Sequence, residues 1–348
     1  MKVISIGSDR KLFEEGSEVR RRAASYAARL GELHVIVFSL KKHRLQEMRV
    51  GPLHIYPTNS SSKLWYIPDT AKVGKKLLTD TDVVTVQDPF ESGLTGLVVH
   101  KGRPLHIQVH TDLFSKGFKK DFRNRIRLMI ARFVLPRAAR IRTVSETIAD
   151  RLHTTYPNIP ISVLPIYVDI QKYQAVEKHS HPRFKTTLLW VGRFEWEKNP
   201  ALAIRAFAET HKTNKDAGLV MLGGGSEEQE LRRLANKLGV ADRVEFPSWQ
   251  EPLSYMKVAD LLLVTSRYEG YGRQIVEALA AGVPVLATDV GIAREAGAII
   301  ASEKEFAAAL TQWMANGPRK AELKDYPYRN FEEYVEKYCA DLEAAIGK

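Results

Sequence analysis

The sequence contains a single cysteine and no long apolar run. Cys339 is alone among 348 residues, so the chain can form no intrachain disulfide and offers no cysteine cluster to a metal. No apolar stretch approaches the roughly 20 residues that a membrane-spanning helix needs. The apolar residues 3–6 are too few for a secretory signal and predict a first strand instead. We therefore expect a protein of the reducing cytoplasm without a metal site.

Acidic residues are few in the first half of the chain, which leaves a strong positive charge there. Residues 1–170 carry 28 Lys and Arg against 16 Asp and Glu, about +12, whereas residues 171–348 carry 24 against 25, about −1. Between Lys116 and Arg142, ten cations stand against one acid, Asp121. A field of this sign attracts an anionic surface or a polyanion.

A segment of this basic half, residues 121–135, has apolar residues at helical spacing. The residues that share the apolar face are Phe122, Ile126, Met129, Ile130 and Phe133, and the cations off that face are Arg123, Arg127 and Arg132. A basic amphipathic helix of this kind can lie in a membrane interface with its cations among the lipid headgroups. The alternative is a crossover helix that packs its apolar face on a sheet and leaves its basic side in water.

Strand-like apolar runs alternate with helix-like segments through both halves, which predicts parallel strands joined by helical crossovers. The expected strands of the first half are 3–7, 33–39, 53–57, 83–87, 105–110 and one that ends near Val144. Those of the second half are 187–192, 218–222, 244–246, 261–264 and 283–287. The expected helices are 18–30, 70–78, 93–100, 227–238, 303–316 and 328–346, with another starting near Pro200. The fold class is thus α/β with doubly wound parallel sheets.

The repeat of this pattern predicts two domains. We assign residues 1–170 to a basic first domain and residues 171–328 to a second domain, and we expect residues 329–348 to form a helix that packs back on the first. The polar stretch 171–185 is interpreted as the linker. Polar groups follow several strands of the first domain, among them His110 and Asp112. Ligands of doubly wound sheets bind at such strand ends.

The clearest candidate site is the stretch from Tyr268 to Glu277. It follows the apolar run 261–264, passes through a glycine-bearing loop and enters a new helix. The amides at such a helix start can hold a phosphate. Glu269 falls in the loop and Glu277 in the helix, where both carboxylates could accept hydrogen bonds from sugar hydroxyls. The alternative is an ordinary strand-to-helix turn with one surface and one helical Glu.

A second candidate site is Gly192–Pro200, at the end of the second domain's first strand. Arg193 can clamp phosphate oxygens with its planar fork, and Lys198 can add a point charge. Two cations that converge on a leaving diphosphate can replace a metal as the electrophilic catalyst. The alternative is a pair of solvated cations near a helix start.

Together these residues resemble the retaining glycosyltransferases of the GT-B fold, specifically glycosyl transferase group 1, or family 4. The matching elements are Gly192-Arg193 with Lys198, the glycine loop Gly223–Gly225, the Glu-x7-Glu pair Glu269 and Glu277 with the trailing residues 278–285, and Glu295. The resemblance is strong over about 187–297 and weaker before. It implies two Rossmann-like domains that face each other across a cleft.

The resemblance also implies donor-side roles. Arg193 and Lys198 would hold the diphosphate of a nucleotide-diphosphate sugar, Glu269 would hydrogen-bond a hydroxyl of the donor sugar, and Glu277 would hold the nucleotide ribose. Further donor contacts are expected at Gly192, Gly224, Gly270, Tyr271, Gly272 and Arg273. No metal and no other cofactor is expected.

For the first domain, the resemblance implies that His110 lies across the cleft near the anomeric centre and that the Gly16 loop approaches the donor phosphate and the acceptor. We place Asp112, Arg123, Arg127 and Arg132 on the acceptor and membrane side. The acceptor would be a glycan or a lipid-linked molecule at the inner face of the plasma membrane, and the anomeric configuration would be retained. The group that takes the acceptor's proton stays open, with the leaving phosphate as a candidate.

Several positions depart from the family pattern. The usual Asn-Gly after the first domain's last proline is Ile166-Tyr167, the usual second glycine after Gly291 is Ile292, and the N-terminal glycine pair is Gly16-Ser17. These departures concern the acceptor side and the sugar more than donor binding. The identity of the sugar, the nucleotide base and the acceptor therefore stays open.

Alternative functions follow from the same residues. A non-enzymatic protein could use the basic first half to bind nucleic acid or another polyanion, although no nucleic-acid module is recognisable. A Rossmann oxidoreductase would need Gly-x-Gly-x-x-Gly, which is missing after residues 3–6, and Gly223–Ser226 lacks its third glycine. A GT-B epimerase or phosphorylase would share the fold, but the intact Glu-x7-Glu pair favours sugar transfer.

Overall fold

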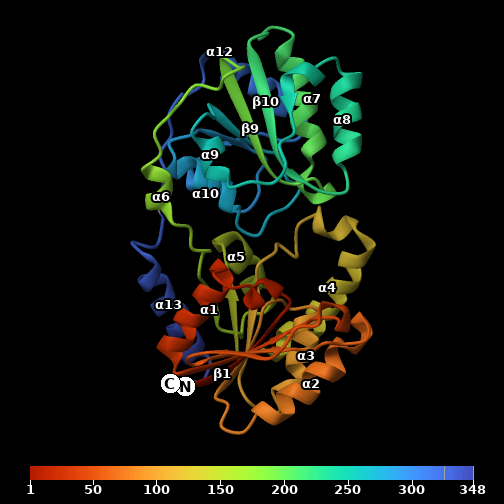
Figure 1. The fold of residues 1–348 in the computed structure, drawn as a ribbon, viewed down its shortest axis with the longest axis vertical. Helices are drawn as coiled ribbons and strands as arrows, with labels where there is room; N and C mark the ends of the chain where they lie inside the picture. Colours follow the sequence, from red (N-terminus) through yellow and green to blue (C-terminus); the bar gives the residue numbers. More distant parts are fainter. Residues whose placement is uncertain (325, 348) are drawn as a thin grey trace. The chain divides into compact units, whose positions relative to one another are not determined.

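The computed structural model describes residues 1–324 and 326–347 and divides the chain into two compact units (Figure 1). The first unit contains Met1–Pro165 together with the residues from Tyr328 onward, and the second contains Ile166–Pro327. The first boundary thus falls at Pro165, before the expected residue 170. The last helix of the chain belongs to the first unit although it follows the second in sequence.

The first unit is built on an eight-stranded sheet of order β3-β4-β2-β1-β5-β6-β7-β8. The strands are β1 (Lys2–Gly7), β2 (Glu32–Val37), β3 (Met48–Val50), β4 (Leu53–Pro57), β5 (Val83–Val86), β6 (Leu105–Val109), β7 (Arg140–Thr143) and β8 (Ile161–Val163). All neighbours pair in parallel except the edge strand β3, which is antiparallel to β4. This short, partly exposed edge strand was not predicted, because three residues carry little periodicity.

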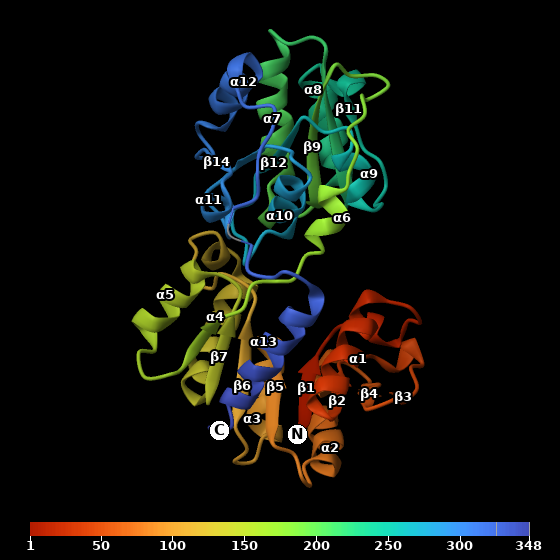
Figure 2. The same cartoon turned by 90° about the vertical axis from the view of Figure 1, so that its left-hand side faces the viewer.

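Helices cover both faces of this sheet (Figure 2). On one face α3 packs against both α2 and α4, and on the other face α1 packs against α13. They are α1 (Glu18–Leu30), α2 (Tyr66–Leu77), α3 (Glu91–Val99), α4 (Phe122–Val134), α5 (Glu146–Thr155) and α13 (Phe331–Ala344). Local sequence sets several of their ends. The Ser17 hydroxyl accepts from the amide of Arg20 at the start of α1, and Gly31, at φ +101°, ends that helix.

Helix α13 is fixed to the first sheet by a buried carboxylate. Asp341 accepts hydrogen bonds from His106 Nε2 at 3.0 Å and from Arg140 Nε and Ser162 Oγ at 2.5 Å each. Burial alone would raise the pKa of Asp341, but these donors outweigh it and hold the pKa well below its usual value. Because an unpaired charge is costly to bury, the set of partners specifies where the helix docks.

The second unit has a six-stranded parallel sheet of order β11-β10-β9-β12-β13-β14. Its strands are β9 (Thr186–Arg193), β10 (Ala217–Gly224), β11 (Val244–Glu245), β12 (Leu261–Val264), β13 (Val285–Ala287) and β14 (Ile299–Ile300). Five strands were expected, and the two-residue β14 is the additional one. Strands β9, β10 and β12 are buried along most of their length, as expected for a parallel sheet covered on both faces.

The helices of the second unit are α6 (Ile170–Gln174), α7 (Pro200–His211), α8 (Glu228–Lys237), α9 (Pro252–Met256), α10 (Arg273–Ala280), α11 (Ala293–Ala296) and α12 (Phe306–Asn316). Large aromatic side chains, among them Trp190, Phe207 and Trp313, fill the core beneath α7 and α12. The prediction that residues 171–185 form a linker was wrong for the first part of this stretch. There α6 packs on α10, and Tyr173 of α6 is buried. This segment therefore belongs to the second unit.

Candidate functional site

The centre of the candidate site in the second unit is an ion pair between Lys198 and Glu269. Lys198 lies at the end of the short helix Trp196–Lys198 that follows β9, and Glu269 lies in the loop between β12 and α10. The Lys198 ammonium donates to Glu269 Oε1, and both side chains are largely buried, at 17% and 10% exposure. Ser266 Oγ and Gln274 Nε2 donate to the same oxygen at 2.8 and 3.2 Å. Three donors therefore converge on one carboxylate oxygen.

The hydroxyl of Thr265 ties the two loops of this pair together. It accepts a hydrogen bond from the Trp190 indole N–H at 2.9 Å and donates toward the carbonyls of Lys198 and Asn199, at 3.0 and 2.9 Å. Asn199 has a left-handed backbone, at φ +49°, just before the proline that starts α7. These hydrogen bonds consequently fix the distance between the loop after β9 and the loop after β12.

Glycines allow the backbones of these loops to approach closely. Gly272 precedes α10 at φ +95°, where side chains are disfavoured. Gly291 has φ +54°, and a Cβ there would lie 2.3 Å from the carbonyl oxygen of Tyr271. The neighbouring amide of Ile292 donates to that carbonyl at 3.0 Å. Because Tyr271 itself is 4% exposed, its side chain anchors the loop, and the same burial raises the pKa of its hydroxyl.

Arg193 is placed differently from Lys198. Its guanidinium is 73% exposed and pairs with Glu197 at 2.6 Å, so the two cations predicted to share a diphosphate each have a carboxylate of their own. The neighbouring Glu195 accepts from the amide and the hydroxyl of Ser226, at 3.0 and 2.9 Å. These bonds lower the pKa of Glu195 and connect the Arg193 loop to the glycine-rich turn after β10.

Gly192 and Gly224 lie where those strands end. A Cβ on Gly192 would lie 3.1 Å from the Trp190 ring, whereas a Cβ on Gly224 would meet nothing within 4 Å. The adjacent Gly223 could not carry a side chain, because a Cβ there would lie 1.9 Å from the carbonyl oxygen of Gly192. The turn therefore brings two strand ends close together and leaves Gly224 open.

Glu277, on α10, is the most buried acid of this region. It is 6% exposed and forms an ion pair with Arg273 Nη2 at 3.3 Å. Burial raises its pKa, against the opposing charge of Arg273. Tyr173 of α6 is hydrogen-bonded to the same carboxylate. The sequence pattern missed this contact because Tyr173 lay in the stretch interpreted as a linker.

In the first unit, His110 follows β6 and is held by Gln108. The His110 Nε2 atom lies 3.2 Å from Gln108 Oε1, which also accepts from Arg142 Nη1 at 2.9 Å. The Gln108 amide donates to Thr85 Oγ1 and Tyr338 OH, so its oxygen must be the acceptor. His110 Nε2 therefore carries the proton, and Nδ1 keeps its lone pair. Burial, and next the charge of Arg142, lower the pKa of His110 to about 3, so the ring is neutral at pH 7.

The other residues predicted for the site in the first unit form ion pairs, lie in a turn or are exposed to solvent. Asp112 forms an ion pair with Arg151 and accepts from the amide of Phe114 at 3.0 Å. Gly16, in the turn that precedes α1, has φ +72°, and a Cβ added there would meet nothing within 4 Å. On α4, Arg127 pairs with Glu91 at 3.1 Å. The remaining predicted cations of α4, Arg123 and Arg132, are exposed.

Comparison with known proteins places the chain in a class. Sucrose-phosphate synthase from Thermosynechococcus elongatus has a TM-score of 0.73 at 18% identity, covering 99% of this chain and 96% of that one. Anabaena HepE, solved with UDP and glucose, has a TM-score of 0.68 at 18% identity, covering 98% and 95%. The two parallel-sheet units thus have the GT-B fold of glycosyltransferases.

The family follows from sequence. The model for Glycosyltransferase Family 4 matches residues 19–172, and the model for Glycosyl transferases group 1 matches residues 172–330. The chain belongs to the group 1 glycosyltransferases. Alpha-monoglucosyldiacylglycerol synthase of Streptococcus pneumoniae is 27% identical over 230 residues, which cover 59% of this chain and 51% of that protein. The aligned part spans about half the length of such curated relatives or less.

The close approach at Gly291 leads to a stability prediction. We expect Gly291→Ala to lower the free energy of unfolding by about 1–3 kcal/mol more than Gly239→Ala, because only the first displaces a backbone carbonyl. Gly239 is the matched control, since it also has positive φ, +70°, but has nothing within 4 Å of an added Cβ. Denaturant unfolding of both variants measures the difference. Equal losses would show that the loop adjusts freely.

Proposed function

We propose that the protein is a retaining glycosyltransferase that moves a sugar from a nucleotide-diphosphate sugar to a glycan or lipid-linked acceptor. The observation that carries this proposal is the buried Lys198–Glu269 pair at the carboxyl ends of β9 and β12, where α/β sheets bind ligands. Family membership and the bound UDP and glucose of Anabaena HepE support the same donor class.

The donor would bind by exchanging partners within the site. A diphosphate can replace Glu269 as the partner of Lys198, since both offer anionic oxygens to the same ammonium. Glu269, still held by Ser266 and Gln274, could then accept a hydrogen bond from a hydroxyl of the donor sugar. Arg193, exposed on a neighbouring loop, could turn from Glu197 to the diphosphate. Glu277 would bind the ribose.

The proposed transfer needs no metal, because Lys198 and Arg193 can offset the charge that develops on the leaving diphosphate. The neutral ring of His110 gives its Nε2 proton to Gln108 and keeps an Nδ1 lone pair that can accept a hydrogen bond from a ligand hydroxyl. The acceptor's proton would pass to the leaving phosphate, since a buried neutral imidazole with a pKa of about 3 is a weak base. Retention of configuration is part of this proposal.

A membrane surface is the proposed place of reaction, and α4 is the element that supports it. Its apolar side chains Phe122, Met129, Phe133 and Ile126 are 73%, 62%, 52% and 41% exposed, so for these four the alternative of a face packed on the sheet does not hold. The packed face of α4 is formed instead by Asn124, Ala131 and Val134. Among the described residues, no helix combines the length and apolarity needed to cross a bilayer. An exposed apolar stripe beside arginines suits binding at the surface of an anionic membrane.

The membrane proposal agrees with a lipid acceptor, which the name of the pneumococcal relative suggests for that protein. The proposed location is the cytoplasmic face of the plasma membrane. The competing function is polyanion binding through the same cations, without sugar transfer. It would draw on the charge of the first half of the chain but would make no use of the Lys198–Glu269 pair or the exposed apolar stripe.

The first test is stabilisation of the purified protein by UDP-, GDP- and ADP-sugars. Because a ligand that binds only the folded state raises the melting temperature, we expect a shift with one nucleotide series and without added metal. The shift should be lost in Glu277→Ala if this carboxylate holds the ribose. No shift with any nucleotide sugar would contradict the donor proposal.

A second test concerns turnover with the donor so identified. We expect Lys198→Ala to lower kcat by about 100- to 1000-fold, as for the loss of a group that stabilises transition-state charge. The matched control is Lys212→Ala, which removes an exposed lysine that also pairs with a glutamate, Glu209. The kcat of both variants is measured from the rate at which the nucleotide is released. Full activity in Lys198→Ala would contradict the diphosphate assignment.

A third test concerns the membrane. We expect replacement of Arg123, Arg125, Arg127 and Arg132 by Gln to weaken binding to phosphatidylglycerol vesicles by at least about tenfold, because each cation near an anionic surface contributes about 1 kcal/mol. Phe122→Ser with Phe133→Ser should weaken vesicle binding without changing binding to heparin. The control is Arg233→Gln with Lys237→Gln on exposed positions of α8. If both α4 variants sediment with the vesicles as the wild-type protein does, the membrane proposal is wrong.

A further inference from the structure

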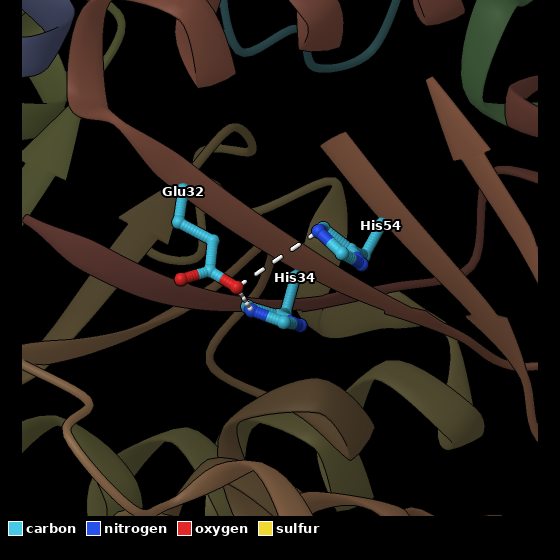
Figure 3. Close-up of side chains that lie close together, drawn as sticks. All are labelled: Glu32, His34 and His54. Atoms are coloured by element: carbon cyan, nitrogen blue, oxygen red, sulfur yellow. Dashed lines mark hydrogen bonds and ion pairs between the residues drawn. The ribbon is translucent and has the colours of Figure 1, made fainter. Parts of the chain in front are cut away.

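Glu32, His34 and His54 form a cluster at the amino-terminal side of the first sheet (Figure 3). Glu32 begins β2, and His34 lies two residues on, so both side chains project from one face of the strand. His54 of β4 is the direct neighbour of His34 in the parallel register. One carboxylate and two imidazoles thus meet on adjacent strands, although 20 residues separate the two histidines in the chain.

The distances within this cluster are close to those of a metal site. Glu32 Oε1 lies 2.8 Å from His34 Nε2 and 3.8 Å from His54 Nε2, and all three ligand atoms lie within 4.8 Å of one another. A tetrahedral zinc ion with bonds of about 2.0–2.1 Å requires ligand atoms about 3.3 Å apart. The two imidazole rings are stacked, with centroids 4.7 Å apart, so the His54 ring must turn about χ2 to aim its lone pair at the shared point. Its partial exposure, 18%, gives it room to turn.

A hydrogen bond already orients the buried member of the cluster. His34 Nδ1 lies 3.1 Å from the Tyr56 hydroxyl, which can donate to it or accept from it. When Nε2 carries the proton shared with Glu32, the Tyr56 hydroxyl donates to Nδ1. When a metal takes Nε2, the proton belongs on Nδ1 and the hydroxyl accepts. Metal-binding histidines commonly have such a partner on the second nitrogen.

Two cations close to the cluster, Lys2 and Arg49, hydrogen-bond to backbone carbonyls instead of Glu32. Lys2, whose positive charge acts on Glu32, donates from Nζ to the carbonyl of Thr79 at 3.1 Å. Arg49, which pairs in register with His54, donates from Nε to the carbonyl of Gly51 at 3.2 Å. Neither side chain has to be displaced from a carboxylate for a cation to enter.

We propose that Glu32, His34 and His54 bind one divalent transition-metal cation of the zinc type. Two imidazole nitrogens with one carboxylate suit Zn²⁺, Co²⁺ or Ni²⁺, whereas Mg²⁺ and Ca²⁺ prefer oxygen ligands. The half-exposed Glu32 leaves a side open for water to complete the coordination. This site differs from the metal-free transfer proposed above and does not rest on it. His110 follows the carboxyl end of β6, whereas the cluster lies at the opposite end of the strands.

The cation would link β2 to β4 at the end of the sheet. Strand β4 is joined to the rest of the sheet through β2 and is flanked outside only by the short edge strand β3. Because a ligand of the folded state raises the free energy of unfolding, occupancy would stabilise this end of the sheet. The stabilisation would be seen without donor or acceptor present.

The experiment uses the full chain without an affinity tag, stripped of metal by a chelator and titrated with ZnCl₂ and with CoCl₂. We expect one equivalent of Zn²⁺ to bind and to raise the melting temperature. Bound Co²⁺ should give visible absorption bands that persist when Mg²⁺ is added. His54→Ala should weaken binding by at least about tenfold, as does loss of supporting groups around metals. Glu32→Gln should also weaken zinc binding. This variant tests a second ligand and leaves the buried His34 unchanged.

The matched control is His181→Ala in the second unit. His181 Nε2 also lies near a glutamate, Glu245, at 3.6 Å, but within the described part of the chain no third metal-ligating side chain joins this pair in a cluster. Its substitution should leave zinc affinity unchanged. Absence of a saturable equivalent of Zn²⁺, or equal affinity in the wild-type and His54→Ala proteins, would overturn the proposal.

Discussion

The ion pair between Lys198 and Glu269 is the interaction on which the candidate site depends. A carboxylate that is taken out of water costs several kcal/mol unless charges and donors replace its hydration. Here Lys198, Ser266 and Gln274 supply those donors from two loops and from the first turn of α10. The loops after β9 and β12 therefore cannot move apart without exposing or stranding a charge. This gives the site its rigidity before any ligand binds.

The same pair explains how a site can be both rigid and ready for an anion. The Lys198 side chain is only 17% exposed and its ammonium already faces an anionic oxygen, so in the proposed donor site a phosphate that takes this place would require little reorganisation. Arg193 has the opposite character, since it is exposed and reaches its partner through an i,i+4 surface pair, a weak kind of contact. In the proposed donor site, one cation is thus preorganised, and the other would turn from its glutamate to the ligand.

The first unit depends on another buried polar network, which begins at the C-terminal helix. Tyr338 of α13 accepts from Gln108, and Gln108 in turn faces Arg142 and His110. Tyr338 thereby helps to set the orientation and the tautomer of His110, which lies far from it in sequence. Such a network is satisfied only when α13 is docked, which links the position of His110 to helix docking.

The sequence by itself determined the local chemistry. The period of its apolar residues predicted the parallel sheets. The family was identified by Gly192-Arg193 with Lys198, the glycine loop, the Glu-x7-Glu pair and Glu295 taken together, and the two matching models confirm it. Short elements such as β3 and β14 were missed, because two or three residues carry no readable period.

Only the tertiary structure decided which side chains meet. Lys198 and Glu269 are 71 residues apart, and His34 and Tyr56 are 22 apart, so spacing along the chain could not pair them. It also decided the faces of α4, because a helical stripe in the sequence has the same period whether it packs on a sheet or faces water. Sequence specifies periods and residue types, whereas contacts between distant strands and loops exist only once the sheet has brought their ends together.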